Sequence, residues 1–297
     1  MRVNPNLSSL MNSGIQSTEQ ALNTAVQQLA SNQRVNVPSD DPAAAAANLQ
    51  SLANSANVDR YTRNGDAVLS QTQMADSALS NVVNELNQAI TLGTQGADGS
   101  MTSENRAAIA TQVQSVLSEV ISQANTTFNG NSLFSGTSAA VPAFVSDSTS
   151  PTGYSYQGNS GVNTAALGDN LQVNVNVPGG QVFTNPNGNV LGSLTQLISA
   201  LGSGTTTDIG DAVAAVRNSL TNVSQQRVLY AGVVNQINSQ ENYLSQETIS
   251  LTSQQQSLTG IDISVAISNL TQAQIAHSTI LAAAAKVLPT SLLDYLK

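Results

Sequence analysis

The longest regular pattern in the sequence is a heptad repeat between residues 208 and 258. Apolar side chains recur there at alternating steps of four and three residues, from Ile209 to Leu258. This spacing brings one face of a helix onto a second helix. Polar side chains interrupt the second half of the repeat, at Arg227, Glu241, Thr248 and Gln255. We therefore expect one long helix that packs continuously at first and more loosely afterwards, against other long helices.

Both ends of the chain carry narrower stripes of the same kind. The C-terminal stripe follows Gly260 and comprises Ile263, Ile267, Leu270, Gln274, His277, Leu281, Ala284 and Leu288. The N-terminal stripe comprises Ile15, Leu22, Val26 and Leu29. Polar residues in such a stripe often specify register or partner. A narrow apolar stripe needs a partner surface, so we expect the two terminal helices to pair with each other and with other subunits.

The rest of the chain divides into helical segments and one β-rich insertion. A second seam comprises Val68, Ala75, Leu79, Val82, Leu86 and Ala89, and follows a helix start that carries Leu49, Leu52 and Ala56. Between 127 and 190 the composition changes to Gly, Asn, Ser and Thr. Leu171, Val173, Val175 and Val177 alternate there, and "PGG" predicts a turn before "QVF". The sequence predicts a mainly α, elongated coiled-coil bundle with five segments: 1–40 pairing with 261–297, 41–126, 127–190, 191–260 and 261–297.

Asp40 and Asp41 are adjacent carboxylates that precede Pro42 and a run of alanines. Acid–base catalysis would need two carboxyl groups with separated pKa values in a cleft. A helix start requires less, because Asp is a good N-cap, Pro fits the first helical position and Ala has the highest helix propensity. We interpret the three residues as a helix start that shapes a bend in the chain.

Composition excludes several functional classes. The net charge of −9 and the scattered basic residues argue against nucleic-acid binding. The chain has no cysteine and a single histidine, His277, which alone forms neither a metal cluster nor a catalytic triad. His277 is expected to be a packed or hydrogen-bonded seam residue, with a pH-sensitive packing switch as the alternative. No secretory signal peptide or membrane span is expected. We predict no cofactor, no metal site and no enzymatic activity.

Three stretches resemble the bacterial flagellin-like axial proteins, and most closely the hook-associated proteins of the hook–filament junction. These are "RVNVPSDDPAAA" at residue 34, the middle stretch "YSYQGNSGVNTAALGDNLQVNVNVPGGQVF" from Tyr154, and the C-terminal "SLLDYLK". The last stretch departs from the pattern of the family, since Leu293 stands where Phe is common and one Lys is added. The resemblance covers nearly the whole chain.

The resemblance implies a structural adaptor that joins hook to filament outside the cell. It implies export by the flagellar type III apparatus with an export chaperone, and assembly into a ring of identical subunits. The implied partners are a hook-side junction protein and flagellin, with no nucleic acid and no membrane. The residues expected at the assembly interface are Leu22, Val26, Leu29, Ile263, Ile267, Leu270, His277, Leu281 and Leu288.

Two other functions remain open at this point. Flagellin, the filament subunit, has the same type of terminal helices. A secreted enzyme or toxin would need a catalytic constellation, and the sequence offers none beyond the adjacent carboxylates Asp40 and Asp41.

Overall fold

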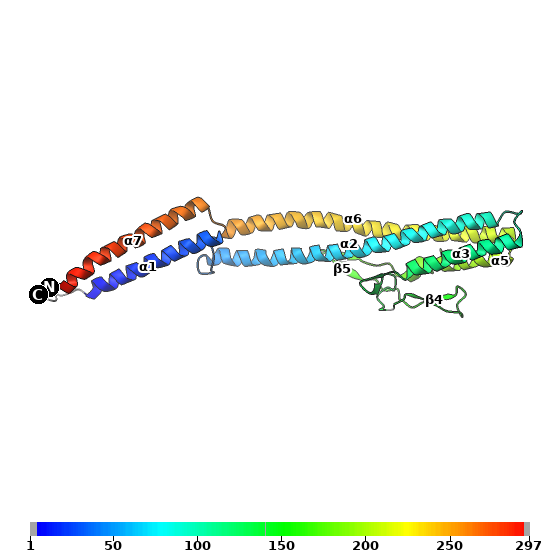
Figure 1. The fold of residues 1–297 in the computed structure, drawn as a ribbon, viewed down its shortest axis with the longest axis horizontal. Coiled ribbons are helices and arrows are strands. Elements are labelled where there is room, and N and C mark those ends of the chain that lie inside the picture. The colour runs from blue at the N-terminus through cyan, green and yellow to red at the C-terminus, as the bar shows by residue number, and fades with distance from the viewer. Residues whose placement is uncertain (1–4, 140, 294–297) are drawn as a thin grey trace. The chain divides into compact units, whose positions relative to one another are not determined.

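A computed structural model describes residues 5–139 and 141–293, with side chains described from residue 9 to residue 286 apart from residue 140. Figure 1 shows that long helices form most of the chain. The helices are α1 (Pro5–Ser31), α2 (Pro42–Gly96), α3 (Ser103–Ala124), α4 (Gly179–Phe183), α5 (Val190–Ser203), α6 (Thr206–Thr259) and α7 (Ile263–Leu293). The strands are β1 (Thr127–Phe128), β2 (Asn131–Ser132), β3 (Phe144–Ser146), β4 (Tyr154–Tyr156), β5 (Thr164–Ala166) and β6 (Gln172–Asn174). The predicted mainly helical fold with a small β-containing insertion is confirmed.

The chain divides into two compact units. One unit combines Met1–Val58 with Gln246–Lys297, and the other is Asp59–Ser245. The smaller unit contains α1 and α7 with one end of α2 and of α6. The larger unit contains the remainder of α2 and α6, the helices α3 to α5, and all the strands.

Four helices pack around the main core of the larger unit. They are α2, α3, α5 and α6, and their buried residues form one continuous cluster. The predicted seam of α2 is buried in full, as Val68, Ala75, Leu79, Val82, Leu86 and Ala89. Gly93 allows the helices to approach closely, because a methyl group there would lie only 2.5 Å from Val213 Cγ2. The heptad pattern therefore identified the packed face of α2 in this unit.

Fewer residues of α6 are buried toward its C-terminal end, as predicted. Its first turns bury residues on several positions of the heptad, whereas its second half buries Tyr230, Ile237, Leu244 and Leu251, each seven residues apart. Arg227, the first polar residue that interrupts the heptad repeat, forms an ion pair with Asp76 on α2. Its Nε and Nη2 donate to Asp76 Oδ1 and Oδ2 at 2.8 and 3.2 Å. This bond raises the pKa of the Arg227 guanidinium.

The helix start of α2 packs on a different face from the one that its leucines indicate. Leu49, Leu52 and Ala56 are exposed, while Ala44, Ser51 and Val58 are buried. The buried residues are spaced by seven and continue the register of the later seam. Leu49 and Leu52 lie outside that register, so the hydrophobic pattern misled where the packed residues are small.

The insertion consists of three antiparallel strand pairs, β1 with β2, β3 with β4 and β5 with β6. Its base is an aromatic cluster in which Phe183 meets Phe134 and Phe144 edge to face, each at 5.4 Å between ring centroids. Tyr156 Oη donates to the Phe134 carbonyl at 2.7 Å. The predicted turn at "PGG" is wrong, since Pro178 instead precedes the short helix α4, which carries Phe183 into this cluster.

A second contact fixes the insertion to the middle of α2. Leu167 is buried against Val68 and Ile237. Beside it, Tyr61 Oη donates to Asp169 Oδ1 at 2.8 Å, and Asn64 Nδ2 donates to the Ala166 carbonyl at 2.9 Å. The insertion is thus attached to the helices at two places.

Candidate assembly interface

The terminal helices α1 and α7 form an antiparallel pair within the smaller unit (Figure 1). Gly14 lies against Ile280, and Thr18 lies against His277, so the residue numbers of the two helices run in opposite directions. A methyl group on Gly14 would overlap the Ile280 side chain. The pair is therefore closely packed at this position.

The seam between α1 and α7 is built from small residues. The residues of these two helices that are buried, within the described part of the chain, are Ala25, Ala266, Ala273 and Ala284. Larger side chains such as Leu22, Leu270 and Ile280 are only half-buried beside them. Alanine buries little apolar area, so the contact within one chain uses only part of the apolar surface of these helices.

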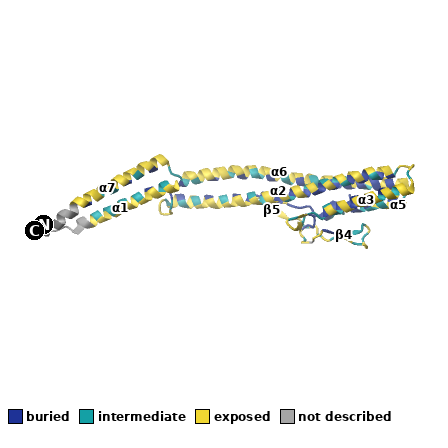
Figure 2. Ribbon diagram, viewed as in Figure 1, coloured by how far each residue is buried: buried dark blue, intermediate teal, exposed yellow. Residues whose placement is uncertain are grey.

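Large aliphatic side chains remain exposed on the same helices, and Figure 2 shows exposed residues along the length of α7. They are Leu10, Val26, Ile263, Val265, Ile267, Ile275 and Leu281. Charge is nearly absent from both helices: α1 contains Glu19 as its one acidic or basic residue, and α7 contains Lys286. An exposed surface that is apolar and almost free of charge is typical of an interaction site.

The residues predicted for the assembly interface fall into two groups. Leu22, Leu29, Leu270 and His277 are half-buried along the seam. Val26, Ile263, Ile267 and Leu281 have exposed fractions between 45% and 56%. The side chain of Leu288 lies outside the described residues.

The four exposed residues of this set lie on one face of the helix pair. Successive residues of an α-helix are rotated by about 100°. Val26 on α1, and Ile263, Ile267 and Leu281 on α7, are displaced from their seams in the same rotational sense. Because the helices run antiparallel, this displacement places them on the same side of the pair. We call this surface, defined by Val26, Ile263, Ile267 and Leu281, the apolar face.

The single histidine makes a polar contact inside the seam. His277 Nδ1 lies 3.2 Å from Thr18 Oγ1. Thr18 Oγ1 also lies 2.9 Å from the Ile15 carbonyl and 3.1 Å from the Gly14 carbonyl of its own helix. The direction of the hydrogen bond between Thr18 and His277 is set by the tautomer of the imidazole ring. The contact fixes the register of α1 against α7 through one pair of side chains.

Asp40 and Asp41 hold the connection between α1 and α2. Asp41 Oδ1 accepts from Ala44 N at 3.0 Å, which is the N-cap geometry predicted for the start of α2 at Pro42. Asp40 Oδ2 accepts from the backbone nitrogens of Asn36 and Val37 at 2.9 and 3.1 Å, which closes a turn. The bond from Ala44, followed by the one from Arg34, lowers the pKa of Asp41. Both carboxylates are engaged in structure rather than paired for catalysis.

Arg34 links this connection to the one between α6 and α7, and the sequence reasoning missed it. Its guanidinium donates to Asp41 Oδ2 at 3.1 Å and to the Leu258 carbonyl at 3.0 Å. Its backbone N–H donates to the Thr259 carbonyl at 2.7 Å. Arg34 therefore caps the C-terminal end of α6 from a distant part of the sequence. Only its place in "RVNVPSDDP", seven residues before the N-cap, could have signalled this role.

The described residues lack sites of two other kinds. No described helix is both long and apolar enough to cross a membrane. The described residues contain no cluster of three or more His, Cys, Asp or Glu side chains suited to a metal ion.

Comparison with known proteins gives a consistent assignment. Residues 3–139 match the family model described as the bacterial flagellin N-terminal helical region. The fold matches that of a flagellar hook-associated protein from Vibrio parahaemolyticus, with a TM-score of 0.68 and 20% identity, covering 74% of this chain and 99% of that one. The N-terminal part of the chain is thus similar to flagellins, and its fold is similar to that of a hook-associated protein. The resemblance drawn from its sequence motifs is confirmed.

Other similar proteins are a junction protein, by its structure, and flagellins, by their sequences. The flagellar junction protein FlgL of Legionella pneumophila matches with a TM-score of 0.61 and 15% identity, covering 72% of this chain and all of that one. Flagellin B of Helicobacter pylori is 31% identical over 138 residues, which are 46% of this chain and 27% of that protein. The flagellin of Listeria monocytogenes is 29% identical over 148 residues, 49% of this chain and 52% of that protein. The chain thus spans about a quarter to a half of these two flagellins.

Proposed function

We propose that this flagellin-like chain is a non-enzymatic structural adaptor that joins the hook of the bacterial flagellum to its filament. Subunits are exported by the flagellar type III apparatus with a chaperone and assemble into a ring, with a hook-side junction protein on one side and flagellin on the other. Its place would be the extracellular flagellum, at the hook–filament junction.

The observation that supports this proposal best is the division of apolar residues on α1 and α7. Alanines fill the seam within the chain, and the larger side chains of the apolar face are left for other subunits. Burying one Leu or Ile contributes roughly 1.5–3 kcal/mol. A ring that covers this face on every subunit would gain that amount several times for each contact.

Flagellin is the second candidate, and the curated relatives favour it. The matched proteins of Helicobacter and Listeria are flagellins. The matches to hook-associated and junction structures reach nearly the full length of those structures, although their low identity supports the fold alone. Deletion of the gene separates the two functions. Without a junction protein, hooks stay bare while filament subunits spill into the medium, whereas loss of flagellin removes those subunits as well.

The assembly step is tested by adding a charge to the apolar face. Ile267→Asp places a carboxylate at a side chain that is 51% exposed, so the monomer should fold and melt as before. Buried against a neighbouring subunit, the same charge would be costly, and junctions should fail to form. Ser268→Asp adds the same charge to the neighbouring exposed position, which lies away from the apolar face, and should assemble normally.

Fluorescent labelling of both variants in motile cells gives the readout. The wild-type chain and Ser268→Asp should label the point where hook becomes filament, and Ile267→Asp should not. Labelling along the whole filament would favour flagellin over the adaptor. Normal junctions with Ile267→Asp would show that the apolar face plays no part in assembly. Leu270 is a less informative position for such a charge, because it is half-buried in the seam of the monomer itself.

A further inference from the structure

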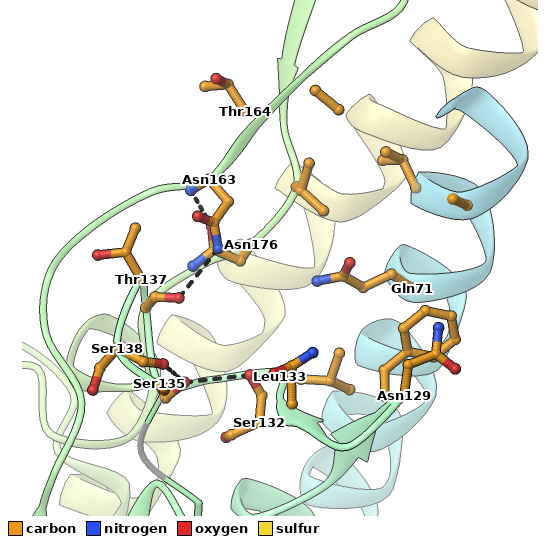
Figure 3. Close-up of a pocket in the computed structure, with 18 of the residues that line it drawn as sticks. Gln71, Asn129, Ser132, Leu133, Ser135, Thr137, Ser138, Asn163, Thr164 and Asn176 are labelled. Carbon is orange, nitrogen blue, oxygen red and sulfur yellow. Dashed lines mark hydrogen bonds between the residues drawn. The ribbon is translucent and has the colours of Figure 1, made fainter. Parts of the chain in front are cut away.

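The larger unit contains a cavity of about 710 Å³ that the assembly function does not use. It lies between α2 and the insertion, and its walls come from α2, the β1–β2 hairpin, the loop that follows it, and the strand β5 (Figure 3). Cavities of about 300–1,000 Å³ are the size that holds small ligands.

The lining of this cavity is polar and uncharged. Its amide side chains are Asn64, Gln71, Asn129, Asn131, Asn163 and Asn176, and its hydroxyl side chains are Ser132, Ser135, Thr137, Ser138 and Thr164. No Asp, Glu, Lys, Arg or His is among the described residues that line it. An ionic ligand would lose its hydration without gaining a countercharge, which is unfavourable. The cavity therefore suits a neutral ligand rich in hydrogen-bonding groups.

One wall is held rigid by its own hydrogen bonds. Asn176 Oδ1 accepts from Asn163 N at 2.6 Å, and Asn163 Nδ2 donates to the Gly136 carbonyl at 3.3 Å. Ser135 Oγ donates to the Ser138 carbonyl at 2.8 Å. A wall fixed in advance spares a ligand the entropic cost of ordering it.

Polar side chains that make no hydrogen bond within the described part of the chain lie on both walls. Gln71 projects from α2 toward the wall that carries Asn163 and Asn176 (Figure 3). The side chains of Gln71, Asn131 and Thr164 make no hydrogen bond with other residues of the described part of the chain. An amide supplies both donors and an acceptor, which matches the hydroxyl groups of a sugar.

Apolar side chains complete the lining. Val68, Leu133 and Val175 are buried at the cavity, and Phe128 is half-buried. A pyranose ring has one face of C–H groups and a rim of hydroxyl groups, so it can meet both kinds of surface in a single pose.

A peptide fits this cavity less well than a sugar. Peptides that bind beside a strand pair with its free backbone groups. The carbonyls of Ala166, Asn163 and Gly136 already accept hydrogen bonds, from Asn64 Nδ2, from Val175 N and from Asn163 Nδ2 respectively. These three carbonyls are therefore not available to a peptide, whereas the side chains of Gln71, Asn131 and Thr164 are available to a sugar.

We propose that this cavity binds a neutral oligosaccharide, with Gln71 and Thr164 as hydrogen-bonding contacts and the Asn163–Asn176 wall as a fixed support. This site shares no residue with the apolar face, so its test is separate from the test of assembly.

Saturation-transfer NMR on the purified full-length chain tests the proposal. The probes are maltotriose, cellotriose and tri-N-acetylchitotriose, with sialyllactose as a charged sugar and a neutral Gly-Ser tetrapeptide as the alternative class. At least one neutral trisaccharide should bind, and Gln71→Ala should weaken its binding about tenfold through the lost hydrogen bonds. Ala67→Trp, at an exposed residue of the lining, should block it by filling the space.

Gln73→Ala is the matched control, since Gln73 is exposed on the same helix and does not line the cavity. It should leave binding unchanged, and circular dichroism should show that all three variants keep their helix content. The proposal is overturned if no neutral trisaccharide binds at millimolar concentration, or if binding survives both Gln71→Ala and Ala67→Trp. Binding of the tetrapeptide alone would also overturn it and assign the cavity to peptides.

Discussion

Tyr230 should make the larger unit lose stability above pH 10. Its ring is 2% exposed in the core where α6 meets the insertion, and its Oη accepts from Val177 N at 3.1 Å. Burial raises the pKa of Tyr230 from 10.0 to about 12. The folded state therefore keeps the phenolic proton in a pH range where the unfolded chain has released it, so unfolding becomes more favourable as the pH rises.

The size of the effect follows from this difference in pKa. A tenfold difference in proton affinity corresponds to about 1.4 kcal/mol. Between about pH 10 and pH 12, Tyr230 should thus remove up to about 3 kcal/mol from the free energy of unfolding. Tyr230→Phe has no such group, but it leaves the Val177 N–H buried without its partner. That variant should be less stable at neutral pH by about 1–3 kcal/mol and should lose less stability at alkaline pH.

Urea unfolding followed by circular dichroism, repeated from neutral to alkaline pH, measures both effects. The stability curves of the wild-type chain and of Tyr230→Phe should approach each other above pH 10. Tyr243→Phe removes a tyrosine that is 58% exposed, and its curve should stay parallel to that of the wild type. Equal alkaline slopes for Tyr230→Phe and Tyr243→Phe would refute the assignment of this pH dependence to Tyr230.

Three further predictions concern packing and capping. Phe183→Ala should lower the free energy of unfolding by about 3–5 kcal/mol, measured as a shift in urea midpoint, because the ring is fully buried among two other phenylalanines. Gly93→Ala should lower the free energy of unfolding by about 1–3 kcal/mol through overpacking. Gly232→Ala should raise it by about 0.5–1 kcal/mol, because no atom lies within 4 Å of the added methyl group. Calorimetry of both variants measures the difference. Hydrogen bonds to the Asp41 carboxylate lower its pKa below 3.8, so Asp41 stops stabilising the fold as the pH falls through that lowered value. In Asp41→Asn, the free energy of unfolding should therefore fall less steeply at acid pH.

Heptad spacing predicted the helices and most of the packed faces in the larger unit. It succeeded where the packed residues are large, as at Leu79 and Leu86, because there the large apolar side chains are also the buried ones. It failed at the start of α2 and misplaced the centre of the α7 seam. At these places Ala and Ser pack inward and Leu or Ile points outward. A hydrophobicity pattern weights large residues, while two closely packed helices favour small ones.

Contacts between distant parts of the chain account for the rest of the difference. The motif around Arg34 does not identify the Leu258 carbonyl at the end of α6 as its partner. The short helix α4 likewise depends on Phe183 reaching Phe134 and Phe144, and local preferences at "PGG" favour a turn. The uncharged cavity beside Gln71 has no sequence motif, because its walls come from several separate segments.

The small residues of the terminal pair are consistent with a chain that completes its packing in an assembly. A seam of large side chains between α1 and α7 would bury the aliphatic surface inside each monomer and leave little for neighbouring subunits. With alanines at 25, 266 and 273, the two helices approach closely, and Val26, Ile267 and Leu281 stay on the outside. The Thr18–His277 contact joins the two helices through polar groups, and the bonds of Arg34 join the connections at one end of the pair. Polar contacts define one arrangement of the helices, while the apolar side chains that would stabilise a ring remain available.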